Sequence, residues 1–454
     1  MTPTESVPGR DGAKGGSKAA GFFRLAEHGT TMRREFLAGL TTFATMSYVL
    51  AVHPRILAAT GMDFRALITV TALAAAAFSV LMALMTNYPI ALAPGMGVNA
   101  FFAFQVCLGL KIPWPAALGL VFYSGLLFLA LSLSGIRRKL IEAFPDPLKK
   151  AITAGIGFFI AFIGLKNAEV IVANPAPLLV GLGDLHAPAV VLAFLGLALS
   201  CVLLARRFKG AIIVSILLLT VFGVFLHQGD GTSVTRWPAS VFGWPAPITP
   251  IFLKLDLGWL WHHWQTGIPI VLAILFADMF SSMAAFLAIG SRAGLLDKDG
   301  NLPKLRQALA ADAIAGSGGA LLGTSTTIIY IESAAGVEVG GRTGLTSVVV
   351  AACFLAALFF TPLIAAIPPS ATAPALIIIG IFMMSELGKL DFGDLVYAAP
   401  AAVTVLVMLL ATIQDGMAIG FLLYVLLALA TGRARSLSLA TLILAAIFLA
   451  RYAL

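Results

Sequence analysis

Long apolar runs recur along almost the whole chain, and they limit what it can fold into. Of its 454 residues, 60% are hydrophobic and only 11% are charged, which is far from the composition of soluble globular domains. Many runs reach the roughly 20 residues that a helix needs to cross the hydrocarbon layer of a bilayer. Because the runs do not alternate as barrel strands do, the sequence predicts an all-α polytopic membrane protein.

We expect fourteen transmembrane segments, seven on each side of a long polar loop. The predicted spans lie near residues 36–57, 66–86, 89–108, 115–134, 148–166, 187–205, 210–227, 267–290, 306–322, 324–338, 343–366, 371–386, 395–411 and 414–431. Because seven is odd, the second set enters from the opposite side, so we predict a 7+7 inverted repeat. For the last apolar stretch, residues 436–454, the sequence leaves open an interfacial segment, a re-entrant piece or a further crossing.

Basic residues gather at the predicted ends of the spans. The clusters are Arg10, Lys14, Lys18, Arg24, Arg33 and Arg34; Arg137, Arg138, Lys139, Lys149 and Lys150; Arg206, Arg207 and Lys209; Arg292, Lys298, Lys304 and Arg306; and Arg433 and Arg435. Threading fourteen crossings from a cytoplasmic N-terminus places every cluster in the cytoplasm, as the positive-inside rule requires. The net charge of +8 is therefore explained by topology, and we expect no nucleic-acid partner.

This topology assigns the polar segments as well. We expect residues 1–34 to form a disordered cytoplasmic tail, since they are rich in glycine and charge and lack the apolar core of a signal peptide. The segment 228–265 becomes an extracytoplasmic loop. The sequence thus predicts a multi-pass protein of a bacterial-type inner (plasma) membrane, with its N- and C-terminal loops in the cytoplasm.

The third and tenth spans are interrupted. The third contains Pro94, which lacks a backbone donor, beside Gly95 and Gly97, which tolerate unusual dihedral angles. The tenth carries a β-branched run, residues 324–331, better suited to extended chain than to helix. We predict that each is a short extended strand followed by a half-helix. Crossed at mid-membrane, the two present backbone donors and positive helix ends to a ligand.

Two carboxylates, Asp278 and Glu332, lie within predicted spans. An ionisable group at that depth costs at least ~2.5–3 kcal/mol unless it faces a partner, a cavity or a substrate, and it usually marks a transport pathway. The three cysteines, Cys107, Cys201 and Cys353, have no spacing typical of metal ligands or disulfides. We find no nucleotide loop or nucleophile constellation, so we predict a transporter without cofactor or metal, not an enzyme.

Six stretches of the chain carry a family resemblance. They are residues 35–48 (EFLAGLTTFATMSY), 87–100 (NYPIALAPGMGVNA), 293–300 (AGLLDKDG), 322–327 (LGTSTT), 330–337 (YIESAAGV) and 340–345 (GGRTGL). In this order they resemble the AzgA-like purine permeases (adenine, guanine or hypoxanthine) of the second nucleobase:cation symporter family, from about Glu35 to the C-terminus. Together the motifs are specific, although each alone is weak.

The resemblance implies an architecture and an activity. A core domain would comprise spans 1–4 (residues 35–134) and 8–11 (266–366), and a gate domain spans 5–7 (148–227) and 12–14 with the C-terminal segment (371–454). The implied activity is import of a purine nucleobase by proton symport with alternating access, the base being held between spans 1, 3, 8 and 10. Sodium as the coupling ion stays open, and a homodimer through the gate domains is implied.

The resemblance also names residues. Glu332 matches the tenth-span acid that binds the base, and Asn99 matches a third-span asparagine linked to transport. In the eighth span, FADMFSS (276–282) has Ser281 where the family carries a substrate-binding aspartate, while Asp278 is kept one turn earlier. Either Asp278 takes over that role, or Ser281 supplies a neutral hydrogen bond and the substrate is a different heterocycle.

The chemistry of these residues suits a flat, nearly neutral purine. A carboxylate such as Glu332 accepts two N–H bonds, and Asn99 offers both a donor and an acceptor. Backbone N–H groups around Gly97 or Thr326 would meet a carbonyl. The candidates for stacking on the ring, or else for packing, are Tyr48, Phe276, Phe280 and Tyr330. The candidates for carrying the proton are Asp278, Glu332 and Asp312, since burial favours a protonated carboxyl group.

Other classes of protein remain as alternatives. An anion carrier of the sulfate or bicarbonate type shares this fold, but its site should favour positive charge over acids. A channel or a non-transporting membrane scaffold forms a second class, which saturable, counterflow-capable uptake would exclude. The sequence does not separate adenine, guanine and hypoxanthine as substrates.

Overall fold

The computed structural model describes residues 21–134, 143–173, 180–229, 231–297, 302–434 and 437–453. Within these ranges, nine helices are long and apolar enough to cross a membrane, and four shorter apolar helices accompany them. Outside the ranges lie residues 1–20 of the predicted tail, residues 298–300 of one motif, and the basic residues Arg10, Lys14, Lys18, Arg137, Arg138, Lys139, Lys298 and Arg435. The count of fourteen crossings stays a prediction.

Helices, or a strand followed by a helix, cover every predicted span. The first half contains α2 (Met32–Met46), α3 (Val49–Ala58), α4 (Phe64–Thr86), β1 (Leu92–Pro94), α5 (Met96–Ala100), the π-helix η1 (Phe101–Gly109), α6 (Trp114–Ser134), α8 (Asp146–Asn167), β2 (Ile171–Ala173), β3 (Val180–Leu182), α9 (Pro188–Ala205) and α10 (Ala211–Phe222).

The second half follows the same plan. It contains α11 (Trp259–His262), α12 (Trp264–Ala293), α13 (Leu305–Leu322), β4 (Thr327–Ile329), α14 (Ser333–Glu338), α15 (Gly344–Ala357), η2 (Leu358–Phe360), α16 (Thr361–Ala366), α17 (Pro369–Met384), η3 (Ser385–Lys389), α18 (Leu395–Leu410), α19 (Ile413–Ala430) and α20 (Leu439–Ala453). The eleventh predicted span breaks at η2, because Pro362 starts a new helix there.

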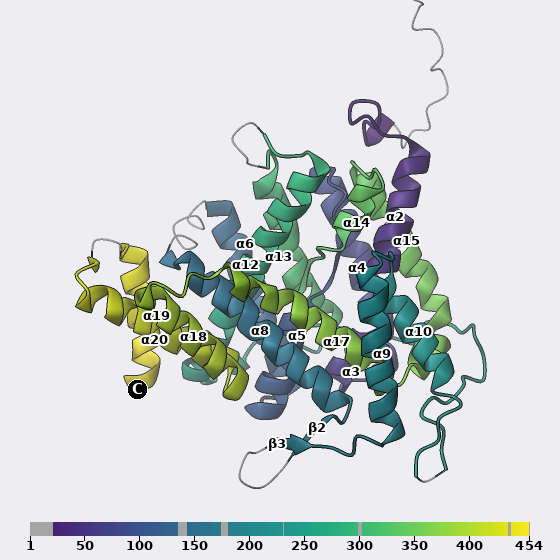
Figure 1. The fold of residues 1–454 in the computed structure, drawn as a ribbon. Coiled ribbons are helices and arrows are strands. Elements are labelled where there is room, and N and C mark those ends of the chain that lie inside the picture. Colours follow the sequence, from purple (N-terminus) through teal and green to yellow (C-terminus); the bar gives the residue numbers. More distant parts are fainter. Residues whose placement is uncertain are drawn as a thin grey trace, which may run out of the picture.

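The helices pack in two groups. In one, α6 contacts α13, while α2 and α4 contact α15, and α14 lies on α2. In the other, α8 contacts α17 and α18, α9 contacts α10 and α17, and α18 contacts α19. Figure 1 shows α8 and α17 side by side, with α18, α19 and α20 gathered at one edge. Each group combines helices from both halves of the chain.

Small residues allow the closest crossing in the second group. A Cβ atom added at Gly157 of α8 would lie 2.7 Å from the carbonyl oxygen of Gly380 in α17, and one added at Gly380 would lie 2.5 Å from that of Gly157. Neither position has room for a side chain, so the two backbones touch directly.

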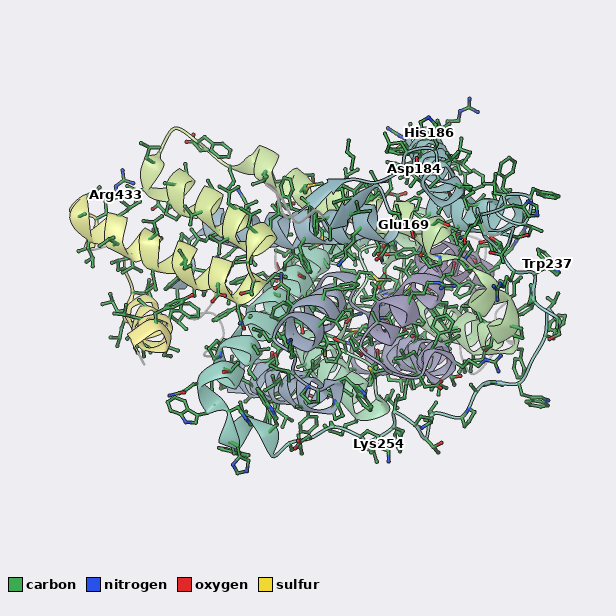
Figure 2. All side chains as sticks on the ribbon, turned by 90° about the horizontal axis from the view of Figure 1, so that it is seen from below. Glu169, Asp184, His186, Trp237, Lys254 and Arg433 are labelled. Atoms are coloured by element: carbon green, nitrogen blue, oxygen red, sulfur yellow. The ribbon has the colours of Figure 1, made fainter. Side chains whose placement is uncertain are left out.

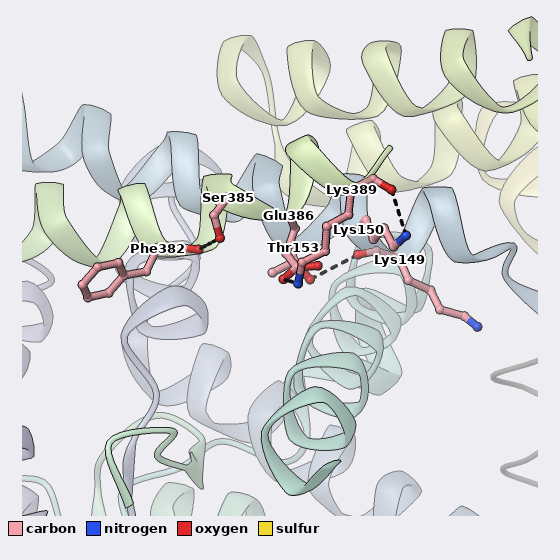
Figure 3. A network of polar contacts seen from close by, with 7 residues as sticks. All are labelled: Lys149, Lys150, Thr153, Phe382, Ser385, Glu386 and Lys389. Atoms are coloured by element: carbon pink, nitrogen blue, oxygen red, sulfur yellow. Dashed lines mark hydrogen bonds and ion pairs between the residues drawn. The ribbon is translucent and has the colours of Figure 1, made fainter. Parts of the chain in front are cut away.

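A side-chain contact also joins these elements near the start of α8. Lys150 Nζ donates to the carbonyl oxygen of Lys389 at 3.0 Å, which connects α8 to η3 (Figure 3).

The interrupted spans meet as a two-stranded sheet, which confirms their predicted extended pieces. Strands β1 and β4 are antiparallel, with Ala93 opposite Ile328 at the centre of the register. Pro94 ends β1 opposite Thr327, after which α5 begins. The third span then continues as the π-helix η1, which the sequence did not predict.

The N-terminal segment is ordered from earlier than the predicted end of the tail at residue 34. Phe23 and Leu25 are buried and pack with Ala83 of α4 and Leu345 of α15. In addition, Asn87 Nδ2 donates to the carbonyl oxygen of Phe23 at 3.0 Å. Burial of Phe23 and Leu25 against α4 and α15 therefore fixes a segment that its polar composition had predicted to be disordered.

Two further segments complete the fold. The C-terminal stretch that the sequence left open forms α20, which packs against α19 and α12. The long segment between α10 and α12 runs along the outside of the bundle, where Trp237 and Lys254 lie at its periphery (Figure 2).

A buried carboxylate joins α2 to the start of α15. Glu35 is 0% exposed, and its oxygens accept from the backbone N–H groups of Arg342 (2.9 Å), Thr343 (3.4 Å) and Thr346 (3.2 Å) and from the Thr346 hydroxyl (2.6 Å). A carboxylate at a helix N-terminus satisfies donors that have no partner within the helix. We infer that Glu35 stabilises the contact between α2 and α15.

Replacing Glu35 tests this role. Glu35→Gln puts an NH2 group opposite backbone donors, so we expect a loss of about 2–3 kcal/mol of stability and a lower thermal midpoint of the detergent-solubilised protein. The matched control is Glu338→Gln, because Glu338 forms an exposed ion pair with Arg292 at 2.9 Å that contributes about 0–1 kcal/mol. Equal midpoints for the two variants would contradict the assignment.

Candidate functional site

Polar side chains from four spans lie around the pair of strands β1 and β4. Helix α3 lies beside β1 and α5, and α12 lies beside β4 and α14. These are the first, third, eighth and tenth predicted spans. Their polar side chains form three hydrogen-bonded clusters around the pair.

The first cluster surrounds Glu332, which immediately precedes α14 and is half-buried. The hydroxyl of Tyr48 donates to Glu332 Oε1 at 2.7 Å. The ring of Tyr330 lies 6.4 Å from that of Tyr48, and its hydroxyl donates to the carbonyl oxygen of Pro94 at 2.6 Å. The two tyrosines therefore connect the acid to α3 and to β1.

The second cluster links three spans through a histidine. His53 of α3 and Asn99 of α5 are both 0% exposed. Asn99 Nδ2 lies 2.8 Å from His53 Nδ1, and His53 Nε2 lies 2.6 Å from Thr324 Oγ1. Asn99 Oδ1 is buried and has no hydrogen-bond partner among the described residues.

The third cluster lies on α12. The hydroxyl of Thr326 donates to Asp278 Oδ2 at 2.7 Å, whereas Asp278 Oδ1 is buried without a hydrogen-bond partner in the described part of the chain. One turn on, the Ser282 hydroxyl donates to Asp312 of α13. Ser281 instead donates to the carbonyl oxygen of Ala277 in its own helix at 2.6 Å. Of the two eighth-span candidates, Asp278 is the one that reaches the tenth span.

The other predicted contacts serve packing in this structure. Phe276 and Phe280 join an aromatic cluster with Phe144, whose ring centroid lies 4.6 Å and 5.3 Å from theirs. Phe421 of α19 lies 4.5 Å from Phe144, so the cluster bridges the two helix groups. A Cβ atom at Gly97 would lie 2.8 Å from Ile156 of α8, and this close approach leaves no space for a side chain.

The clusters lie at two ends of the strand pair. Because Gly95 N donates to the carbonyl oxygen of Thr326 (3.0 Å), Thr326 and its partner Asp278 lie at the end where α5 begins. Glu332 lies beyond the other end, where Tyr330 N donates to the carbonyl oxygen of Ala91 (3.0 Å). Among the described residues, no hydrogen bond joins Glu332 to Asp278.

Two cavities lie away from this centre. One, of about 950 Å³, is lined by Arg55, Arg65 and Arg236 together with loop residues. The other, of about 350 Å³, is apolar and includes Leu40 and Phe43. Neither of these two cavities is lined by a residue of the three clusters.

His53 and its contact with Thr324 were not predicted from the sequence. The available signal was an ionisable residue inside an apolar run, VLAVHPRIL, since such residues in spans usually have a specific partner. The partners of His53, which are Asn99 and Thr324, come from the third and tenth spans and meet it only in the folded structure.

The chain is similar in sequence to known permeases. A model described as "Permease family" matches residues 33–447. The chain is 39% identical to the adenine permease AdeP of Escherichia coli (strain K12), covering 94% of each chain. It is 40% identical to the guanine/hypoxanthine permease PbuG of Bacillus subtilis (strain 168), covering 91% of this chain and 94% of that one.

A solved structure shares the fold. The transmembrane domain of the cyanobacterial bicarbonate transporter BicA aligns with a TM-score of 0.63 at 15% identity, covering 86% of this chain and 97% of that one. This likeness confirms the predicted fold class. The relatives confirm the resemblance seen in the motifs, and they confirm a membrane transporter rather than an enzyme. The chain, an integral multi-pass membrane protein, belongs to the Permease family.

Proposed function

We propose that this protein is a secondary active transporter that imports a purine nucleobase by proton symport with alternating access. The observation that carries the proposal is the likeness to an adenine permease and a guanine/hypoxanthine permease over at least 91% of the chain. Glu332 and Asn99, the residues expected to bind the base, flank the crossed strands of the third and tenth spans.

Unsatisfied acceptors support a base-binding role. Asn99 Oδ1 and Asp278 Oδ1 are buried without a hydrogen-bond partner among the described residues. Each such atom costs about 1–3 kcal/mol, and native proteins keep few of them without a functional reason. A purine carries N–H donors along its edge, so it would satisfy these oxygens, while Glu332 accepts a further, charge-assisted bond.

The hydroxyl partners support proton coupling. Glu332, Asp278 and Asp312 each contact a hydroxyl group, that of Tyr48, Thr326 or Ser282. A hydroxyl donates to a carboxylate, and its oxygen accepts from a protonated carboxyl group. Each pair therefore tolerates both protonation states of its carboxyl group without rearrangement, as a proton carrier requires. Coupling to sodium instead of the proton is the alternative, and an uptake experiment must distinguish the two ions.

The two helix groups support the proposed moving parts. Residues 35–134 and 266–366 would form the core domain that holds the base, and residues 148–227 and 371–454 the gate domain. We propose a homodimer through the gate domains. The distribution of basic residues supports placement in a bacterial-type inner membrane with cytoplasmic N- and C-terminal loops.

The fold likeness to a bicarbonate transporter raises a second candidate, an anion carrier. A carrier of anions needs positive charge at its site, whereas the residues around the strand pair include Glu332 and Asp278. We therefore favour the purine. Ser281 keeps a different heterocycle as the remaining alternative. While its hydroxyl donates to the carbonyl oxygen of Ala277, its oxygen can still accept a hydrogen bond from a ligand.

Replacing the tenth-span acid tests the proposal. Glu332→Gln puts an NH2 group where the base needs an acceptor and cannot carry a proton. We expect accumulation of labelled adenine, guanine or hypoxanthine in a permease-deficient host to fall by about a hundredfold or more, with normal membrane insertion. The control is Glu338→Gln in α14, the helix that Glu332 precedes. Accumulation like that of the wild type would remove the assigned role.

The eighth span offers a second test. Asp278→Asn should weaken base affinity by about tenfold, because the amide breaks the present acceptor pattern. Ser281→Asp adds a carboxylate one turn on and should change base preference. Competition uptake with unlabelled bases at two pH values measures both effects, and replacing sodium in the medium separates the coupling ions. If neither variant alters affinity or preference, α12 does not line the site.

A further inference from the structure

His53 is a buried histidine whose ring contacts two neutral side chains. Its partners are Asn99 at Nδ1 (2.8 Å) and Thr324 at Nε2 (2.6 Å). No carboxylate among the described residues forms a hydrogen bond with the ring. The three residues are each 0% exposed, and they join the first, third and tenth spans.

The donor and acceptor pattern along this chain is restricted. A neutral imidazole has one N–H donor and one acceptor nitrogen. With Asn99 Nδ2 facing Nδ1, that nitrogen accepts, so Nε2–H must donate to the Thr324 hydroxyl oxygen. The carboxamide of Asn99 then keeps its NH2 group toward His53, and its oxygen is left without a hydrogen-bond partner in the described part of the chain.

We propose that His53 and Thr324 hold the Asn99 carboxamide with its oxygen toward the substrate, and so set the preference between 6-amino and 6-oxo purines. This inference rests on the proposed function. His53 and Thr324 are positioning residues, because they act through Asn99 and not on the base.

The chemistry of the bases makes the orientation decisive. Adenine presents a donor at its 6-amino group and an acceptor at N1, whereas hypoxanthine presents an acceptor at O6 and a donor at N1. The two patterns are opposite at both positions. Turning the Asn99 carboxamide therefore exchanges the favoured base, whichever of the two positions Asn99 meets, because a mismatch leaves buried polar groups unpaired.

Thr324→Val provides the test. Valine keeps the volume and removes the hydroxyl, so Nε2–H would lack an acceptor. A buried N–H without a partner is less tolerated than an unused acceptor, and the ring should shift its proton to Nδ1. That N–H needs Asn99 Oδ1 as its acceptor, which turns the carboxamide and presents NH2 to the base.

The readout is the ratio of the inhibition constants of adenine and hypoxanthine against uptake of a labelled base. We expect Thr324→Val to shift this ratio about tenfold or more in the direction opposite to the preference of the wild type. Thr324→Ser, which restores a hydroxyl, should return the ratio toward that of the wild type. Thr71→Val is the matched control, since the Thr71 hydroxyl donates to its own helix at Leu67 (2.6 Å).

A second variant covers failure to fold. His53→Gln keeps an amide near Thr324 but no longer holds Asn99, so the ratio should approach one. Thr324→Val is the deciding variant if it inserts into the membrane, and His53→Gln decides if it does not. The proposal is overturned if the deciding variant keeps a ratio within twofold of the wild-type ratio. A wild-type protein that takes up no purine would instead overturn the proposed function, and the wild-type measurement shows this before any variant is made.

Discussion

The pairing of β1 with β4 is the constraint on which the rest of the structure depends. Backbone groups in a hydrocarbon layer need internal partners, and each interrupted span supplies them to the other through bonds such as Gly95 N to Thr326 O. The same pairing draws α3 and α12 alongside, which brings Tyr48, His53 and Asp278 to the strands. The extended segments that interrupt the third and tenth spans are thus also the segments around which these polar side chains lie.

Buried carboxylates in this molecule are of two kinds. Glu35 accepts from three backbone N–H groups and a hydroxyl, so its charge is fully used in holding α2 to α15. Asp278 has one hydroxyl partner and one buried oxygen with none among the described residues. The first pattern is typical of structural anchoring and the second of a site that awaits a donor. The contrast supports the division between scaffold and binding centre.

The sequence predicted the parts of the fold that local chemistry controls. The length of the apolar runs predicted the spans. Pro94 with the two glycines that follow it, and the β-branched run before Glu332, predicted the two strands. The motifs indicated the family. Other features were not predicted. The docking of Phe23 against α4 depends on neighbours distant in sequence, whereas the π-helical winding of η1 and the bond of Ser281 to Ala277 are local arrangements that the residue pattern did not indicate. The chain of Asn99, His53 and Thr324 depends on three spans meeting, so no single segment could reveal it.

The most direct test of the central claim is an experimental structure of the protein in lipid nanodiscs with a bound purine. The account predicts density for a flat base beside the β1–β4 crossing, within hydrogen-bond distance of Glu332 and of at least one of Asn99 and Asp278. A base bound elsewhere, for example in the cavity lined by Arg55 and Arg236, would contradict it.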